Sequence, residues 1–321
     1  MINGINSREM ILEILLEIEE GEHSHVAIRN ALSKYQFLPK QDRAFITRVC
    51  EGTLEYRIQI DYIINSFSKV TVDKMKPAIR EILRSAVYQL KFMDSVPDSA
   101  VCNEAVKLAQ RKGFYNLKPF VNGVLRTIAR EISDLELPSR EENEVRYLSV
   151  KYSMPEYLVE KWKAAYGVKT TEKILEDFLT ERPITVRCRT HKASLREIVT
   201  SLKSQGVTVE QAPYLPYALK ISDYNHILTL ETFLQGKILV QDVSSMLVAE
   251  AASPKKGDHI IDMCAAPGGK SIHVADKMGD YGNVDARDVS QYKADLIEEN
   301  IHRTGVINVE ARVQDATVYD P

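Results

Sequence analysis

The stretch with the most distinctive chemistry is 262–271, which reads DMCAAPGGKS. It follows the apolar run HIID, which predicts a buried strand, and it precedes SIHVADKM, which predicts a helix. A glycine-rich loop at this place presents unpaired backbone N–H groups and the positive end of a helix dipole, so it is suited to bind a phosphate or a carboxylate. Cys264 in the same loop is also a candidate nucleophile.

Three kinds of ligand-binding loop compete for this stretch. A nucleoside-triphosphate loop requires GxxxxGK[ST]; Gly269, Lys270 and Ser271 match its end, but Cys264 stands where its first glycine is needed. A dinucleotide loop requires GxGxxG, which the stretch does not contain. The third kind binds S-adenosylmethionine (SAM): the loop holds the carboxypropyl end, and acids after the next two strands hold the ribose and the adenine.

Two aspartates stand where a nucleoside would need them. Asp288 ends the second predicted strand, GNVDARD, and Asp315 follows the third, INVEARVQD. Carboxylates at these places can accept hydrogen bonds from ribose hydroxyls and from an adenine amine. Either aspartate alone would fit an ordinary loop or helix cap, but together with the loop they favour the SAM interpretation.

The loop also resembles a known family. Residues 264–271 resemble the first motif of the RNA cytosine-C5 methyltransferases, with serine for the common threonine, and FLQGKILVQDVSSMLVAEAA (233–252) resembles the segment that leads into it. VPDSAVCNEAVKLAQ (96–110) and FVNGVLRTIAR (120–130) resemble the antiterminator NusB. The combination resembles the bacterial Sun/Fmu (RsmB) family, which methylates C5 of a cytosine in 16S ribosomal RNA.

The resemblance implies a site, a partner and a domain order. The implied SAM site consists of the loop and the two acids, which are Cys264, Ala265, Ala266, Pro267, Gly268, Gly269, Lys270, Asp288 and Asp315. For Lys270, a solvated lysine at a helix start is an equally good interpretation. The implied domains are a NusB-like helical RNA-binding domain (1–138), a small RNA-recognition-like α/β module (139–240) and the first part of a Rossmann-like SAM-dependent methyltransferase domain (241–321). The implied partner is 16S ribosomal RNA in the cytoplasm.

Methylation at C5 of cytosine requires a nucleophile. A thiolate that adds to C6 makes C5 enamine-like, and a base later removes the C5 proton so that the thiol can leave. The resemblance places these groups in Pro-Cys and Thr-Cys motifs downstream of the cofactor loops, and the chain contains neither dipeptide. We therefore assign Cys264 to packing of the cofactor loop, and we read Cys50, Cys102 and Cys188 as ordinary helix or strand residues.

The sequence ends after the third strand, whereas the resemblance implies a larger sheet. We therefore expect these residues to be a fragment that lacks the target-base pocket and the nucleophile. Such a fragment would bind RNA, and SAM only weakly, without methylating. Two alternatives stay open. The chain could be a noncatalytic RNA or ribosomal-protein binding module of NusB type, or a methyltransferase for an exocyclic amine, which would call for an Asn/Asp-Pro-Pro-Tyr motif.

The elements that position these residues change in type along the chain. Residues 7–132 have helical periodicity, clearest at 76–92, and predict an all-α bundle. The polar stretch 133–143 reads as a linker. Short strands and helices follow over 144–240, and strand–helix alternation from 241 onward indicates parallel βαβ units. The sequence thus predicts a multidomain protein: an all-α bundle, a small α/β module and a partial α/β Rossmann-like domain.

The charge distribution favours a polyanion partner for the helical part. The net charge is −3, but residues 74–130 carry eleven Lys and Arg against four acids. The candidate RNA-binding residues on these helices are Lys107, Arg111, Lys112, Lys118, Arg126 and Arg130. In the middle module, Arg187 and Arg189 alternate along one strand, and with Tyr214 and Tyr217 they could stack on single-stranded bases. Solvated helix faces and ordinary surface arginines fit the same pattern.

The composition excludes several other classes. The four cysteines form no CxxC pair and have no accompanying histidine cluster, which argues against a structural zinc site and a disulfide framework and for a reducing cytoplasm. The N-terminal apolar stretch contains acids, unlike a signal peptide. No apolar run reaches the length of about 18 residues that a membrane span needs, so we expect no membrane segment and no metal.

Overall fold

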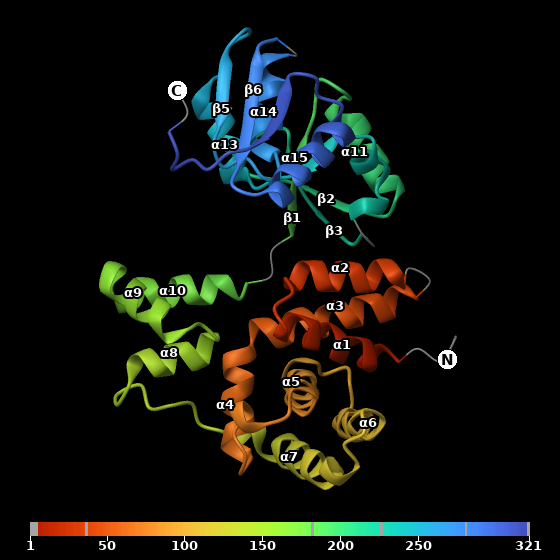
Figure 1. Cartoon of the computed structure of the whole chain (residues 1–321), viewed down its shortest axis with the longest axis vertical. Helices are drawn as coiled ribbons and strands as arrows, with labels where there is room; N and C mark the ends of the chain where they lie inside the picture. Colours follow the sequence, from red (N-terminus) through yellow and green to blue (C-terminus); the bar gives the residue numbers. More distant parts are fainter. Residues whose placement is uncertain (1–5, 36–37, 181–182, 225–226, 280, 320–321) are drawn as a thin grey trace. The chain divides into compact units, whose positions relative to one another are not determined.

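The structure is a computed structural model that describes residues 6–35, 38–180, 183–224, 227–279 and 281–319 (Figure 1). The chain divides into two compact units, Met1–Thr180 and Glu181–Pro321. The first unit is helical, and the second contains two separate β-sheets with their helices. The predicted multidomain order of an all-α bundle, a small α/β module and an α/β domain with a parallel sheet is confirmed.

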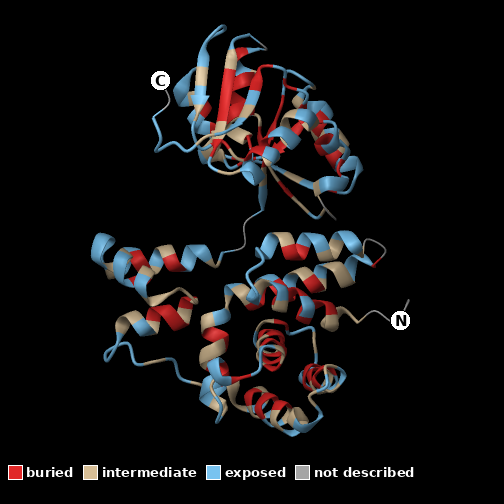
Figure 2. Cartoon of the chain, viewed as in Figure 1, coloured by how far each residue is buried: buried red, intermediate tan, exposed pale blue. Residues whose placement is uncertain are grey.

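The first unit is built around one central helix. Its helices are α1 (Ser7–Glu19), α2 (Ser24–Lys34), α3 (Lys40–Glu55), α4 (Arg57–Phe67), α5 (Pro77–Phe92), α6 (Asp98–Arg111), α7 (Lys118–Glu131), α8 (Glu144–Tyr152), α9 (Glu156–Tyr166) and α10 (Val168–Phe178), with short 3-10 turns at Val72–Lys74, Tyr115–Leu117 and Ile132–Asp134. Helix α5 packs against α1, α3, α4, α6 and α7, and it is buried over much of its length (Figure 2). Its proline at the first helical turn suits a helix start, because that N–H has no helical partner.

The second unit begins with a four-stranded antiparallel sheet in the order β2-β3-β1-β4. Its elements are β1 (Ile184–Cys188), α11 (Leu195–Ser204), β2 (Thr208–Gln211), β3 (Ala218–Ser222), a 3-10 turn at Ile227–Thr229, α12 (Glu231–Leu234) and β4 (Ile238–Val240). A capping box at Ser194 and Glu197 starts α11. Strand β4 was not among the predicted strands, although the apolar run KILV at 237–240 is a signal for one.

A three-stranded parallel sheet in the order β5-β6-β7 completes the second unit. Its elements are α13 (Val243–Ala252), β5 (His259–Asp262), α14 (Gly269–Met278), β6 (Asn283–Asp288), α15 (Gln291–Thr304) and β7 (Val309–Val313). Val284 and Ala286 of β6 share an apolar cluster with Ile272 of α14 and Ile297 of α15. The predicted strand–helix alternation is therefore confirmed, and it brings the loops after β5, β6 and β7 to one edge of the sheet.

The boundary between the two compact units does not coincide with a predicted domain boundary. The division into compact units falls between Thr180 and Glu181, so helices α8, α9 and α10 belong to the helical unit and the two sheets belong together. The predicted domains 1–138, 139–240 and 241–321 place their boundaries elsewhere, and they stay predictions.

Candidate cofactor-binding site

The loop between β5 and α14 is closed by an aspartate at the end of β5. Asp262 accepts a hydrogen bond from the Cys264 backbone N–H through Oδ1 (3.3 Å) and one from the Ser271 hydroxyl through Oδ2 (2.8 Å). Asn300 of α15 donates from Nδ2 to the Pro267 carbonyl (2.9 Å). Three side chains from neighbouring elements thus hold the loop at its start, middle and end. Asp262 and Asn300 were not among the residues predicted for this site.

Gly268 makes the turn into α14. It has a φ of 96°, in the left-handed region that side chains rarely adopt, and it is the N-cap of the helix. A Cβ at this position would also lie 3.4 Å from Cγ2 of Ile297. The turn leaves the first amides of α14 without helical acceptors, so they remain available to an anionic group.

Asp288 lies at the end of β6 and contacts the loop directly. Its Oδ2 accepts from the Ala266 backbone N–H (3.0 Å), its Oδ1 accepts from the Val289 N–H (2.9 Å), and Lys293 Nζ lies 3.0 Å from Oδ1. Burial by itself would raise the pKa of Asp288, but these amide and ammonium donors outweigh it and hold the pKa below its ordinary value. Asp288 is therefore an ionised hydrogen-bond acceptor beside the loop.

Asp315 follows β7 at the same edge of the sheet. The neighbouring Gln314 backbone N–H donates to the Asp288 carbonyl (2.9 Å), which places the segment after β7 next to the end of β6. The Asp315 side chain is exposed, and its Oδ1 accepts from the Thr317 N–H (2.8 Å) and hydroxyl (2.7 Å). The structure thus places Asp288 against the loop and the segment after β7 against Asp288, while the binding of SAM by the loop, Asp288 and Asp315 stays a prediction.

The cysteines differ sharply in their surroundings. Cys264 is exposed, so the assignment of its side chain to packing of the loop is wrong; its main chain instead fixes the loop, through Asp262 and through a hydrogen bond from Lys270 Nζ to its carbonyl (3.3 Å). Cys50, Cys102 and Cys188 are buried. Burial raises the pKa of all three thiols, to about 12 for Cys188, so they remain protonated and unreactive at neutral pH.

A pocket of about 450 Å³ adjoins the loop. It lies within the second unit and is lined by the loop, by the first residues of β1 and by the segment that joins β4 to α13. Its polar lining includes Thr185, Gln241, Asp242, Ser245 and Lys270. A pocket of this size falls in the range that holds small organic ligands.

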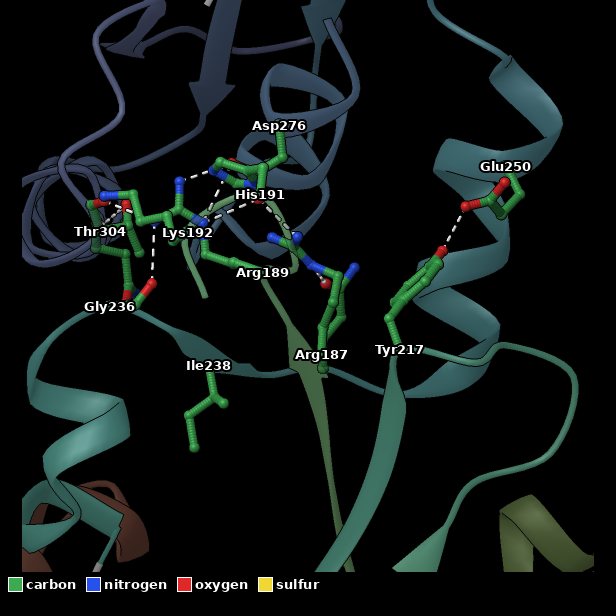
Figure 3. A network of polar contacts seen from close by, with 12 residues as sticks. Arg187, Arg189, His191, Lys192, Tyr217, Gly236, Ile238, Glu250, Asp276 and Thr304 are labelled. Atoms are coloured by element: carbon green, nitrogen blue, oxygen red, sulfur yellow. Dashed lines mark hydrogen bonds and ion pairs between the residues drawn. The ribbon is translucent and has the colours of Figure 1, made fainter. Parts of the chain in front are cut away.

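Arg187 and Arg189 do not form the exposed RNA-stacking face that we predicted. Their side chains are only 2% and 1% exposed, and both guanidinium groups bind the carboxylate of Asp276 in α14, with shortest distances of 2.6 Å each (Figure 3). Arg189 also donates to the carbonyls of Gly236 (3.0 Å) and Thr304 (2.6 Å). The pair therefore fastens the antiparallel sheet to the helices of the parallel sheet. Alternation along a strand indicates which residues share a face, but not that this face is covered.

The two tyrosines predicted to stack beside these arginines differ in their exposure and contacts. Tyr214 is 84% exposed, whereas the hydroxyl of Tyr217 donates to the carboxylate of Glu250, and its ring meets that of His273 edge-on at 5.5 Å. Only Tyr214 remains available for contact with a base.

The six basic residues predicted for RNA contact lie on α6, on α7 and in the connection between them. Lys107 pairs with Glu104 (2.7 Å), Lys112 with Glu9 (3.2 Å) and Glu13 (3.0 Å), and Arg130 with Glu131 (2.5 Å). Lys118 and Arg126 donate to the side chains of Gln110 and Asn122, and Arg111, Arg126 and Arg130 are exposed. Three of the six residues therefore pair with nearby acids while keeping partial exposure, and contact of this basic face with RNA stays a prediction.

Two further properties concern the part of the chain that the structure describes. Among these residues, no helix is long and apolar enough to cross a membrane. Within the same residues, no group of three or more His, Cys, Asp and Glu side chains is arranged to hold a metal ion.

Comparison with known proteins gives three family matches that follow one another along the chain without overlap. The NusB family model matches residues 5–130, the ferredoxin-like domain of RsmF/B-like methyltransferases matches 154–227, and the 16S rRNA methyltransferase RsmB/F model matches 249–321.

Curated relatives and a solved structure extend the similarity over nearly the whole chain. The probable ribosomal RNA small subunit methyltransferase B of Bacillus subtilis is 35% identical over 311 residues, which covers 96% of this chain and 68% of that protein. The corresponding protein of Synechocystis is 30% identical over 98% of this chain and 70% of its own length. The crystal structure of PH0851 is similar with a TM-score of 0.77 at 27% identity, over 98% of this chain and 70% of that one.

Proposed function

The chain belongs to the ribosomal RNA small subunit methyltransferase RsmB/F family, and from this premise we propose that residues 264–270, Asp288 and Asp315 bind SAM as the methyl donor. The observation that carries the proposal is the position of Asp288, whose carboxylate accepts from the loop at Ala266 and whose carbonyl accepts from the segment after β7. One residue therefore joins all three parts of the proposed site.

The chemistry of these residues fits SAM. The free amides at the start of α14 suit the donor's carboxylate, and Gly268 keeps the loop free of a side chain at the turn. The lowered pKa of Asp288 keeps it ionised, so it can accept hydrogen bonds from ribose hydroxyls. Asp315 lies one residue beyond the contact with Asp288, where it can accept from an adenine amine. SAM bound at this site supplies the methyl group.

We propose further that the acceptor is C5 of a cytosine in 16S ribosomal RNA, activated by a cysteine that adds to C6. The buried, protonated thiols of Cys50, Cys102 and Cys188 do not fit that nucleophile, and Cys264 belongs to the donor loop. These four thiols therefore do not supply the proposed nucleophile, and we propose that residues 1–321 bind RNA and SAM without methylating. This function places the protein in the cytoplasm with the ribosomal RNA.

Calorimetric titration with SAM tests the donor site. We expect heat from the unmodified chain and binding weaker by on the order of tenfold for Asp288→Asn, because charge-assisted hydrogen bonds to the ribose are lost. The matched control is Asp295→Asn, an exposed aspartate on α15 whose replacement makes the same change of charge. Equal affinity in the Asp288 variant and the unmodified chain would contradict the assignment. Transfer of labelled methyl groups to ribosomal RNA by residues 1–321 would contradict the proposed inactivity.

A second candidate function is a noncatalytic RNA or ribosomal-protein binding module of NusB type. The match of residues 5–130 to the NusB family favours it. RNA binding by the unmodified chain with no heat from SAM would support this function over the enzymatic one.

A further inference from the structure

Arg303, in the last turn of α15, is a half-buried cation that neutral groups hold in place. Its guanidinium lies over the ring of Phe233, 3.9 Å from the ring centroid, and Nη1 donates to the carbonyls of Phe233 (2.8 Å) and Ile238 (3.2 Å). Within the described part of the chain, no carboxylate forms an ion pair with it. Burial, together with the nearby charge of Arg189, lowers the pKa of Arg303 to about 10, so it stays charged at neutral pH. A charge in such a place depends on the hydrogen-bond acceptors around it.

The other side of the guanidinium orients the side chain of Asn300. Arg303 donates to Asn300 Oδ1 from Nη2 (2.7 Å) and from Nε (3.3 Å). Because a guanidinium has N–H donors and no acceptor, the amide atom that faces it must be the oxygen. The amide nitrogen then points the other way, where it donates to the carbonyls of Pro267 (2.9 Å) and Leu296 (3.2 Å). Arg303 therefore decides which end of the Asn300 amide faces the donor loop.

The orientation matters because the two ends of an amide have opposite hydrogen-bonding roles. If the Asn300 amide turned over, its oxygen would face the Pro267 carbonyl oxygen, with no proton between two acceptors. The loop would then lose one of the three side chains that hold it. Arg303 is itself fixed by carbonyls at the end of α12 and in β4, so the hydrogen bonds run from the antiparallel sheet through α15 to the loop.

We propose that Arg303 is a positioning residue for methyl-donor binding, which holds the Asn300 amide with its N–H toward Pro267 and thereby fixes the donor loop against α15. The inference rests on the proposed function, because it takes the loop to bind SAM. Arg303 forms no hydrogen bond to the described residues of the loop, so its effect passes through Asn300. A loop that is already in place loses little freedom when the donor binds.

Hydrogen–deuterium exchange of the peptide 262–271 tests the positioning without any ligand. Arg303→Met keeps an unbranched chain that can pack on Phe233 but removes every donor, and Asn300→Leu removes the amide. We expect either variant to speed the exchange of this peptide on the order of fivefold, as for the loss of one hydrogen bond. The double variant should exchange no faster than Asn300→Leu, since without the amide Arg303 has nothing to orient.

Two controls accompany the exchange measurement. Peptides from β6 report the opening of the whole sheet, so a change confined to 262–271 is a change of the loop. Arg196→Met is the matched control variant, because Arg196 is an exposed arginine on α11 of the same unit. Exchange of the loop in this variant should equal that in the unmodified chain.

Calorimetric titration with SAM measures the consequence for the donor. We expect affinity to fall on the order of fivefold in either single variant and no further in the double variant. Urea denaturation separates this effect from a purely structural one. The double variant should be less stable than Asn300→Leu, because the carbonyls of Phe233 and Ile238 also lose their donor, yet SAM affinity and loop exchange should not follow that further loss.

Three outcomes would overturn the inference. The first is unchanged exchange of 262–271 in Arg303→Met, and the second is a double variant whose loop exchanges faster than that of Asn300→Leu. The third is faster loop exchange with unchanged SAM affinity, which would separate the loop's order from donor binding. No heat from SAM with the unmodified chain would instead contradict the proposed function, and the exchange of the loop would still decide whether Arg303 positions it.

Discussion

Replacing Asp276 with asparagine tests how the two sheets of the second unit are joined. Asp276 lies in α14 with its side chain 6% exposed, and it faces the guanidinium groups of Arg187 and Arg189 at 2.6 Å. Burial alone would raise the pKa of Asp276, but the two arginines outweigh it and lower the pKa, so the carboxylate is ionised at neutral pH. Asparagine keeps the size of the side chain and removes its charge, which leaves two buried cations without a counterion.

The size of the effect follows from this burial. Removing one partner of a buried ion pair costs about 3–5 kcal/mol, because the remaining charge stays in a poorly solvated place. If the free energy of unfolding falls by about 2 kcal/mol per molar urea, this loss corresponds to a fall of about 2 M in the urea concentration at the midpoint of unfolding. Adding Arg187→Met to the Asp276→Asn background should recover part of the loss, since one unpaired cation is removed. Arg189→Met should recover less, because Arg189 also satisfies the carbonyls of Gly236 and Thr304.

Urea denaturation with two probes measures this effect and contains its own control. The chain has a single tryptophan, Trp162, which lies in α9 of the helical unit. Far-UV circular dichroism at 222 nm follows both units. We expect Asp276→Asn to lower the midpoint of the transition that unfolds the sheets and to leave the Trp162 fluorescence transition in place. An unchanged dichroism midpoint at pH 7 would refute the reasoning that this carboxylate is a charged link between the sheets.

Three further changes test other parts of the structure. Burial lowers the pKa of His273 from 6.5 to about 3. The unfolded chain therefore binds a proton that the folded chain excludes, and the free energy of unfolding falls by about 1.4 kcal/mol per pH unit as the pH drops from 6.5 toward 3. His273→Phe should flatten this pH dependence, as urea titrations between pH 4 and 7 would measure. Gly236→Ala should destabilise the second unit several times more than Gly206→Ala, as thermal melts would show. Both glycines have a positive φ, but only the Cβ at position 236 would meet backbone, at 2.5 Å from the Arg303 carbonyl oxygen. If the basic helices contact RNA, reversing three exposed charges should weaken RNA binding. The slope of the logarithm of the binding constant against the logarithm of the salt concentration should fall in magnitude by about 1 per lost phosphate contact, as filter binding would measure. Unchanged binding would assign this face to solvent or protein. The three are Arg111, Arg126 and Arg130.

The local elements of this protein were predictable from the sequence because their determinants are local. The predicted helices at 76–92 and 118–131 match α5 and α7, whose apolar residues recur at helical spacing. The donor loop was equally visible, since glycine at 268 serves a turn that begins a helix. Asp288 ends β6 and Asp315 follows β7 at the same edge of the sheet, because parallel strands joined by right-handed helices end at the same edge; their role in binding SAM stays a prediction.

The sequence by itself therefore determined the helices, the strand–helix alternation and the edge at which the proposed donor site is built. The tertiary structure decided what covers each face. We predicted that Arg187 and Arg189 form a surface for RNA, because the alternation along a strand does not say which side is covered. Their partner Asp276 lies in a different element, 89 and 87 residues further along the chain. The same packing seats Gln241 beside the donor loop. Burial and pairing depend on contacts between distant segments, and these contacts exist only once both sheets and their helices have assembled.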